Sequence, residues 1–169
     1  VEPFWVYPGF ERNAVAALAI GRPAVHLVMP DGLGSGTPVI QHGHFGQATG
    51  RGVGLVVECG QHFLQSSSHV AIEVTRRFLA HFGLVEPDPQ APPAAPARRF
   101  ELLQTYVIKT PEFRFVRPCI GFEVFARGEL IATDGPDEIR APCADCTVLM
   151  PARAAIVGRE GVYLARPLS

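Results

Sequence analysis

Apolar and polar positions divide the chain into two regions with different periodicities. In the first region, the Ala-rich stretch 11–20 predicts a helix that ends at Gly21, and the apolar run 24–29 predicts a strand. Residues 68–82 place apolar side chains at helical spacing, which predicts a second helix that ends at Gly83. Strands that alternate with helices indicate an α/β sheet.

One strand of this region ends in a carboxylate. Residues 53–57 (VGLVV) are apolar on both alternating faces, which predicts a strand buried between two helical layers. Glu58 follows, and then Cys59 and Gly60, which lets the chain turn. A buried carboxylate is costly, and ligands of open α/β sheets bind beyond the carboxyl ends of strands. Glu58 is therefore either a catalytic residue or a side chain that emerges into solvent.

The second region consists of short apolar runs separated by Gly and Pro. These runs predict a compact β-barrel or β-sandwich. The strands are expected at 102–108, 114–116, 122–125, 130–133 and 147–150.

A proline cluster separates the two regions. Residues 86–98 contain five prolines, which forbid a helix and favour an extended, semi-rigid linker. We therefore expect one domain at 1–85, a linker at 86–98 and a β-rich domain at 99–169.

Composition and charge exclude several classes of function. The chain is 47% hydrophobic and 18% charged, with a net charge of -1 and no basic block, so we expect no nucleic-acid partner. It has no apolar run of about 18 residues, so we expect no membrane span. The N-terminus does not resemble a signal peptide, and four Cys fit a reducing compartment, so a cytoplasmic protein is expected. The first residue is not Met, which we interpret as a piece of a longer chain.

Two stretches, VGLVVECGQH at 53–62 and DCTVLMPARAAIVGREGVYLA at 145–165, carry a family resemblance. The first resembles the strand ending in Glu-x-Gly of the succinylglutamate desuccinylase/aspartoacylase family, which is related to the zinc carboxypeptidases. The second resembles the C-terminal barrel of that family. The resemblance implies the C-terminal portion of a zinc-carboxypeptidase-like α/β sheet domain, followed by a small β-barrel or β-sandwich domain.

The resemblance also implies a reaction. The family's zinc lowers the pKa of a bound water and polarises an amide carbonyl, and the family's Glu moves the proton to the leaving amine. That Glu matches Glu58, and the substrate would be an N-acyl amino acid or a similar small amide. The family's zinc ligands, a His-x-x-Glu pair and a later His, lie upstream of the matched segment. His69 and Glu73 are one residue too far apart for that pair. Zinc is therefore expected in the full-length enzyme, bound by an N-terminal half. That half would be a partner of this chain, and a homo-oligomer is also possible.

The sequence departs from the family at the substrate. The family's Arg, ten residues before the Glu, is Ala48 here, and its barrel Tyr falls at 156–157, which are Ile and Val. Succinylglutamate and N-acetylaspartate are therefore not the expected substrates. Arg51 and His44, in the Gly-rich segment 41–52, are the candidate substrate-binding residues.

Other motifs are weaker. His42 and His44 could share a metal, but their Gly-rich segment looks like a loop. Cys143 and Cys146 form a C-x-x-C that lacks a second ligand pair, so two ordinary thiols are the favoured interpretation. Cys59 with His62 is a poor nucleophile pair, and PDGLGSG at 30–36 lacks the Lys of a phosphate loop. The alternative function is a non-catalytic scaffold or partner-binding fragment in which Glu58 is structural.

Overall fold

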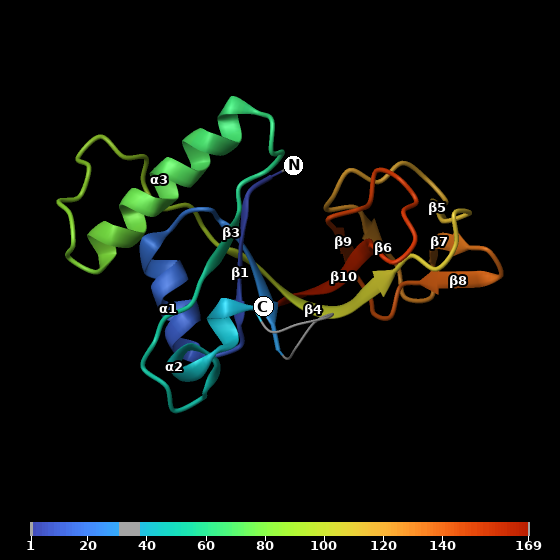
Figure 1. The fold of residues 1–169 in the computed structure, drawn as a ribbon, viewed down its shortest axis with the longest axis horizontal. Coiled ribbons are helices and arrows are strands. Elements are labelled where there is room, and N and C mark those ends of the chain that lie inside the picture. The colour runs from blue at the N-terminus through green and yellow to red at the C-terminus, as the bar shows by residue number, and fades with distance from the viewer. Residues whose placement is uncertain (1, 31–37, 169) are drawn as a thin grey trace. The chain divides into compact units, whose positions relative to one another are not determined.

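The computed structural model describes residues 2–30 and 38–168 of the chain (Figure 1). The chain divides into two compact units, Val1–Arg99 and Phe100–Ser169. Most of the loop PDGLGSG lies outside the described residues. The domain limits expected from the proline cluster stay a prediction.

The first unit alternates strands and helices. Its elements are, in chain order, β1 (Phe4–Pro8), α1 (Glu11–Ile20), β2 (Val25–Met29), the 3₁₀ turn η1 (Val39–Gln41), α2 (Gly43–Gly46), β3 (Val56–Glu58) and α3 (Gln65–His81). β1 pairs with β2 in parallel and with β3 antiparallel, so the strand order is β3-β1-β2. Within the described ranges, no helix is both long enough and apolar enough to cross a membrane.

The helix α1 occupies the residues predicted for it. Its Ala-rich sequence favours a helix, and Ala16, Ala17 and Ile20 are buried. Gly21 ends α1 in the left-handed conformation, with a φ of 76°, and its N–H donates to the Ala17 carbonyl oxygen at 3.1 Å. A Cβ on Gly21 would lie 2.5 Å from the Ala94 Cβ. Both the backbone and the packing therefore require glycine here.

The helix α3 begins earlier than predicted. It starts at Gln65 rather than at residue 68, and no side chain caps its N-terminus, so the sequence lacks a signal for the first turn. The predicted apolar face is present, because Val74 is buried and the Phe78 ring lies 4.9 Å from the Phe82 ring. Gly83 follows with a φ of 69°, as expected for a glycine that ends a helix.

The strand β3 differs from the prediction in length and burial. The run 53–57 predicted a strand buried on both faces, but only Val56–Glu58 pairs, and these residues are half-buried. β3 is the edge strand of the order β3-β1-β2, and β1 is its only partner among the described residues. One open side explains why an apolar run stays partly exposed.

A polar cluster is buried within the first unit. His26 is 1% exposed, and its Nδ1 lies 3.0 Å from the Tyr7 hydroxyl. Burial and then the positive charge of Arg99 lower the pKa of His26 to about 4, and a hydrogen bond to the Pro23 backbone acts in the opposite direction. His26 is therefore a neutral imidazole in the folded protein near pH 7.

The second unit consists of strands. They are β4 (Arg98–Val107), which starts at the end of the first unit, β5 (Arg114–Phe115), β6 (Val124–Phe125), β7 (Leu130–Asp134), β8 (Asp137–Arg140), β9 (Cys146–Leu149) and β10 (Glu160–Leu168). The strand order of the larger sheet is β3-β1-β2-β4-β10-β9-β6, and β5, β7 and β8 form a small antiparallel sheet. The mixed α/β class is therefore confirmed.

Two of these strands were not predicted. β8 (DEIR) has one buried side chain, Ile139, and it forms because the turn at Gly135, with a φ of 57°, folds it back onto β7. β10 contains Pro167 near its end, and proline is unusual inside strands. Pairing with neighbouring strands outweighs local preference in both cases.

Candidate functional site

Glu58 lies beside the first described residues of the chain. In the antiparallel register of β1 and β3, Glu58 is opposite Phe4, and Val56 is opposite Val6. Glu58 therefore lies at the edge of the sheet where β1 begins. Because β3 is antiparallel to β1, the carboxyl end of β3 lies beside the start of β1. Glu58 is half-buried, and Gly60 turns the chain with a φ of 112°.

The thiol next to Glu58 is poorly suited to act as a nucleophile. Burial raises the pKa of the Cys59 thiol, and the negative charge of Glu58 raises it further. A nucleophilic cysteine needs the opposite environment, in which the thiolate is stabilised. The structure therefore disfavours the pairing of Cys59 with His62.

An apolar loop follows Glu58. The Phe63 side chain is 100% exposed and Leu64 is 52% exposed. The loop has a defined conformation, because the Ser67 hydroxyl donates to the Gln61 carbonyl oxygen at 2.7 Å and the Leu64 N–H donates to the same oxygen at 3.1 Å. An ordered loop thus presents apolar surface close in sequence to the carboxylate.

The Gly-rich segment before β3 is held by Arg12. The Arg12 guanidinium donates to carbonyl oxygens of the segment, those of Gly52 at 2.8 Å, Ala48 at 3.1 Å, His44 at 3.5 Å, Phe45 at 2.9 Å and Gln47 at 2.8 Å. Five donors in a planar fork suit this role, which Lys could not fill. No sequence motif indicates this role of Arg12, because its partners are backbone atoms.

Asn13 provides a second anchor for the same segment. Its side chain is fully buried, its Oδ1 accepts from the Gly54 N–H at 3.2 Å, and its Nδ2 donates to the Pro8 carbonyl oxygen at 3.4 Å. The segment is therefore fixed at the end of β1 that carries Pro8.

Close backbone packing explains the glycines of this segment. A Cβ on Gly46 would lie 1.8 Å from the Gln41 carbonyl oxygen, and one on Gly50 would lie 2.0 Å from the His44 carbonyl oxygen. No side chain fits at either position. The Gly-rich composition is thus required by packing and does not by itself indicate a bound ligand.

The structure does not bring His44 and Arg51 to Glu58. Their segment is anchored at the Pro8 end of β1, whereas Glu58 pairs with Phe4 at the other end. Four residue steps of about 3.3 Å separate these ends by roughly 13 Å. In Figure 1, α2 lies toward one end of β1, and the start of β1 lies at the other end. Both side chains are exposed, and their role in substrate binding stays a prediction.

The described residues do not fit a zinc ion. Across 2–30 and 38–168, no three His, Cys, Asp or Glu side chains gather into a group that could hold a metal. Glu73, near His69 in sequence, forms an ion pair with Arg77 at 2.9 Å. Cys146 is buried, and burial together with the neighbouring Cys143 raises its pKa to about 12.

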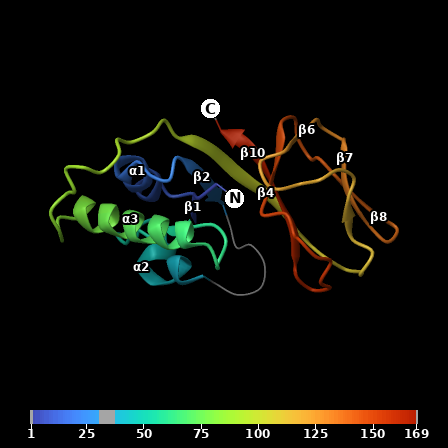
Figure 2. The ribbon, with the colours of Figure 1, turned by 90° about the horizontal axis from the view of Figure 1, so that it is seen from above.

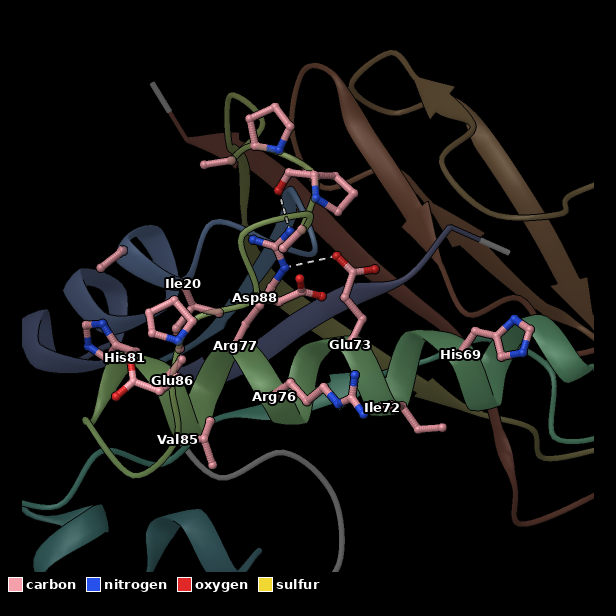
Figure 3. Close-up of a pocket in the computed structure, with 17 residues that line it drawn as sticks. Ile20, His69, Ile72, Glu73, Arg76, Arg77, His81, Val85, Glu86 and Asp88 are labelled. Carbon is pink, nitrogen blue, oxygen red and sulfur yellow. Dashed lines mark hydrogen bonds and ion pairs between the residues drawn. The ribbon is translucent and has the colours of Figure 1, made fainter.

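A pocket of about 780 Å³ lies elsewhere in the first unit, between α3, the end of α1 and the segment 85–94 (Figure 3). Its lining includes Ile20, Ile72, Arg76, Arg77 and Glu86. Glu58 is not part of this lining, so the pocket is separate from the carboxylate singled out by the sequence.

These features define a mixed α/β protein with a seven-stranded mixed sheet and a three-stranded antiparallel sheet. The structure is similar to succinylglutamate desuccinylase from Vibrio cholerae, with a TM-score of 0.68 and 17% identity over 98% of this chain and 49% of that chain. It is also similar to the product-bound ectoine utilization protein EutE (DoeB) from Ruegeria pomeroyi, with a TM-score of 0.67 and 15% identity over 99% of this chain and 53% of that chain.

A succinylglutamate desuccinylase/aspartoacylase from Rhodobacter sphaeroides matches with a TM-score of 0.66 and 16% identity over 99% of this chain and 54% of that chain. The resemblance drawn from the sequence is thus confirmed as a likeness of fold. The chain spans about half the length of these solved structures. No family model matches the sequence, and no curated protein matches it either.

Proposed function

We propose that the chain is part of a zinc-dependent hydrolase that cleaves the amide bond of an N-acyl amino acid or a similar small amide, with Glu58 as the general base. The observation that carries the proposal is the pairing of Glu58 with Phe4. In a longer protein, residues upstream of β1 would reach the sheet at the edge on which Glu58 lies. The zinc ligands that the resemblance places upstream would then lie close to Glu58.

The chemistry assigned to this chain is proton transfer. A bound zinc supplies an acidic water and a polarised carbonyl in enzymes of this kind. In this proposal Glu58 takes the proton from the attacking water and passes it to the nitrogen of the leaving amine. The half-buried position at the end of an apolar strand limits competing hydration of the carboxylate. Residues 99–169 would correspond to the family's barrel domain, and the protein would act in the cytoplasm.

The substrate is expected to be less acidic than those named in the matched structures. Ala48, at the position of the family's Arg, cannot hold a carboxylate, and a bidentate guanidinium contact is among the strongest hydrogen-bonded pairs. Phe63 and Leu64 expose apolar surface in the loop after Glu58. The full-length protein should therefore hydrolyse N-acetylleucine at least about tenfold more efficiently, in kcat/KM, than N-acetylaspartate or succinylglutamate.

A panel of N-acyl amino acids assayed for release of the free amino acid measures this preference. Efficient turnover of either acidic compound would show that another cation, such as Arg51, replaces the family's Arg. Absence of turnover for every member would favour the alternative, a partner-binding fragment in which Glu58 is structural.

A further inference from the structure

The segment 85–94, which we call the strap, borders the pocket together with α3 and the end of α1. Figure 2 shows the chain leaving the end of α3 and passing α1 to reach β4. The N-terminal end of the strap is fixed by the Leu84 N–H, which donates to the Leu79 carbonyl oxygen at 2.9 Å. Its C-terminal end is fixed by the Ala95 N–H, which donates to the Gly21 carbonyl oxygen at 3.4 Å.

The middle of the strap is rigid and pinned. Arg77 of α3 donates to the Pro92 carbonyl oxygen, and the Arg22 Nε donates to the Pro93 carbonyl oxygen at 3.3 Å. The prolines of the strap have a restricted φ and no N–H donor, which stiffens this segment between its hydrogen-bonded points. The pocket of about 780 Å³ beneath it is therefore preformed, and its volume is in the usual range for small-molecule sites.

The two walls of this pocket carry opposite charges. On α3, Arg77 is neutralised by Glu73 at 2.9 Å, which leaves the Arg76 guanidinium without an ion pair or hydrogen bond to a described residue. On the strap, Glu86 likewise has none, and Asp88 uses one oxygen to accept from the Gln90 N–H at 2.9 Å. Figure 3 shows Arg76 on the helix and both acids on the strap.

Apolar side chains line the same pocket as the charged groups. Ile20 at the end of α1, Ile72 on α3 and Val85 on the strap line the same pocket. Ile72 is 54% exposed and Val85 is 42% exposed, so a ligand could remove further apolar area from water.

We propose that this pocket binds a small zwitterion with apolar side chains, of the size of a free apolar amino acid or a dipeptide. Arg76 binds its carboxylate, Glu86 and Asp88 bind its ammonium group, and the apolar side chains contact Ile72 and Val85. This site is independent of Glu58 and of the proposed hydrolysis.

The test is a titration of the ¹⁵N-labelled protein with the dipeptide Leu-Leu, followed by two-dimensional NMR. Leu-Leu-amide lacks the carboxylate and N-acetyl-Leu-Leu lacks the ammonium group. Amide shifts should be confined to residues 69–94, and each capped dipeptide should bind about tenfold more weakly, because a hydrogen bond to a charged group is lost.

Two variants test which wall of the pocket binds the carboxylate and which binds the ammonium group. Arg76→Gln should weaken the binding of Leu-Leu about tenfold but leave the affinity for Leu-Leu-amide unchanged. The double variant Glu86→Gln with Asp88→Asn should also weaken the binding of Leu-Leu about tenfold, but leave the affinity for N-acetyl-Leu-Leu unchanged. Arg114→Gln, an exposed position on β5, is the control that should change nothing. Absence of amide shifts at millimolar Leu-Leu would overturn the proposal. It would also be overturned if the capped dipeptides bound as tightly as Leu-Leu.

Discussion

Glu58→Gln is expected to lower kcat of the full-length enzyme by about three orders of magnitude, because general acid–base catalysis typically contributes 10²–10⁴-fold and this residue would serve as both base and acid. Glutamine keeps the volume and much of the hydrogen bonding of the side chain. The melting temperature should barely change, since a neutral amide is less costly to half-bury than a carboxylate. Zinc content should also be unchanged, because Glu58 is not assigned as a ligand.

The matched control is Glu112→Gln, which neutralises an exposed carboxylate in the second unit. It should leave kcat within a factor of about two. If Glu58 were purely structural, the pattern would reverse, with activity within a few-fold of the wild type and a lower melting temperature. A fully active Glu58→Gln enzyme would end the assignment of Glu58 as the base.

Stability is expected to fall as the pH falls from about 6.5 to 4, because His26 resists protonation in the folded state. Its pKa is lowered to about 4 by burial and by Arg99, whereas an unfolded His titrates near 6.5. In this window the unfolded chain takes up a proton that the folded chain does not, so folding loses up to about 3 kcal/mol at about 1.4 kcal/mol per pKa unit. Below pH 4 this group adds no further loss.

Urea unfolding at pH 4 and at pH 7 measures the effect. His26→Asn, which keeps a polar atom near the Tyr7 hydroxyl, should flatten the pH dependence, whereas His81→Asn, at an exposed position on α3, should not. An unchanged slope in His26→Asn would show that His26 is not the group responsible.

The sequence predicted local structure best where local preference and packing agree. The helix α1 has its predicted limits because alanine favours a helix and because glycine suits position 21 in two ways. Gly21 adopts the left-handed backbone conformation that ends the helix, and its lack of a Cβ leaves room for Ala94. β3 was predicted to be buried because its residues are apolar, but burial depends on neighbours, and β1 is its only described partner. β8 was missed because its pairing with β7 outweighs its charged composition.

The surroundings of the candidate site were harder to predict. Glu58 could be singled out from the end of an apolar run, but the antiparallel pairing that places it beside Phe4 depends on a long-range register. Arg12 and Asn13 were missed because they hold backbone atoms about 40 residues away, which no motif encodes. The Gly-rich segment indicated a ligand loop, yet Gly46 and Gly50 are required by close backbone contacts.

Metal analysis of the isolated 169-residue chain and of the full-length protein tests the central claim, that this chain carries the general base but not the zinc ligands. The account predicts about one zinc per full-length protein, and neither stoichiometric zinc nor hydrolase activity in the chain alone. Tight one-to-one zinc in the chain alone would contradict it and would direct attention to His42, His44, Cys143 and Cys146.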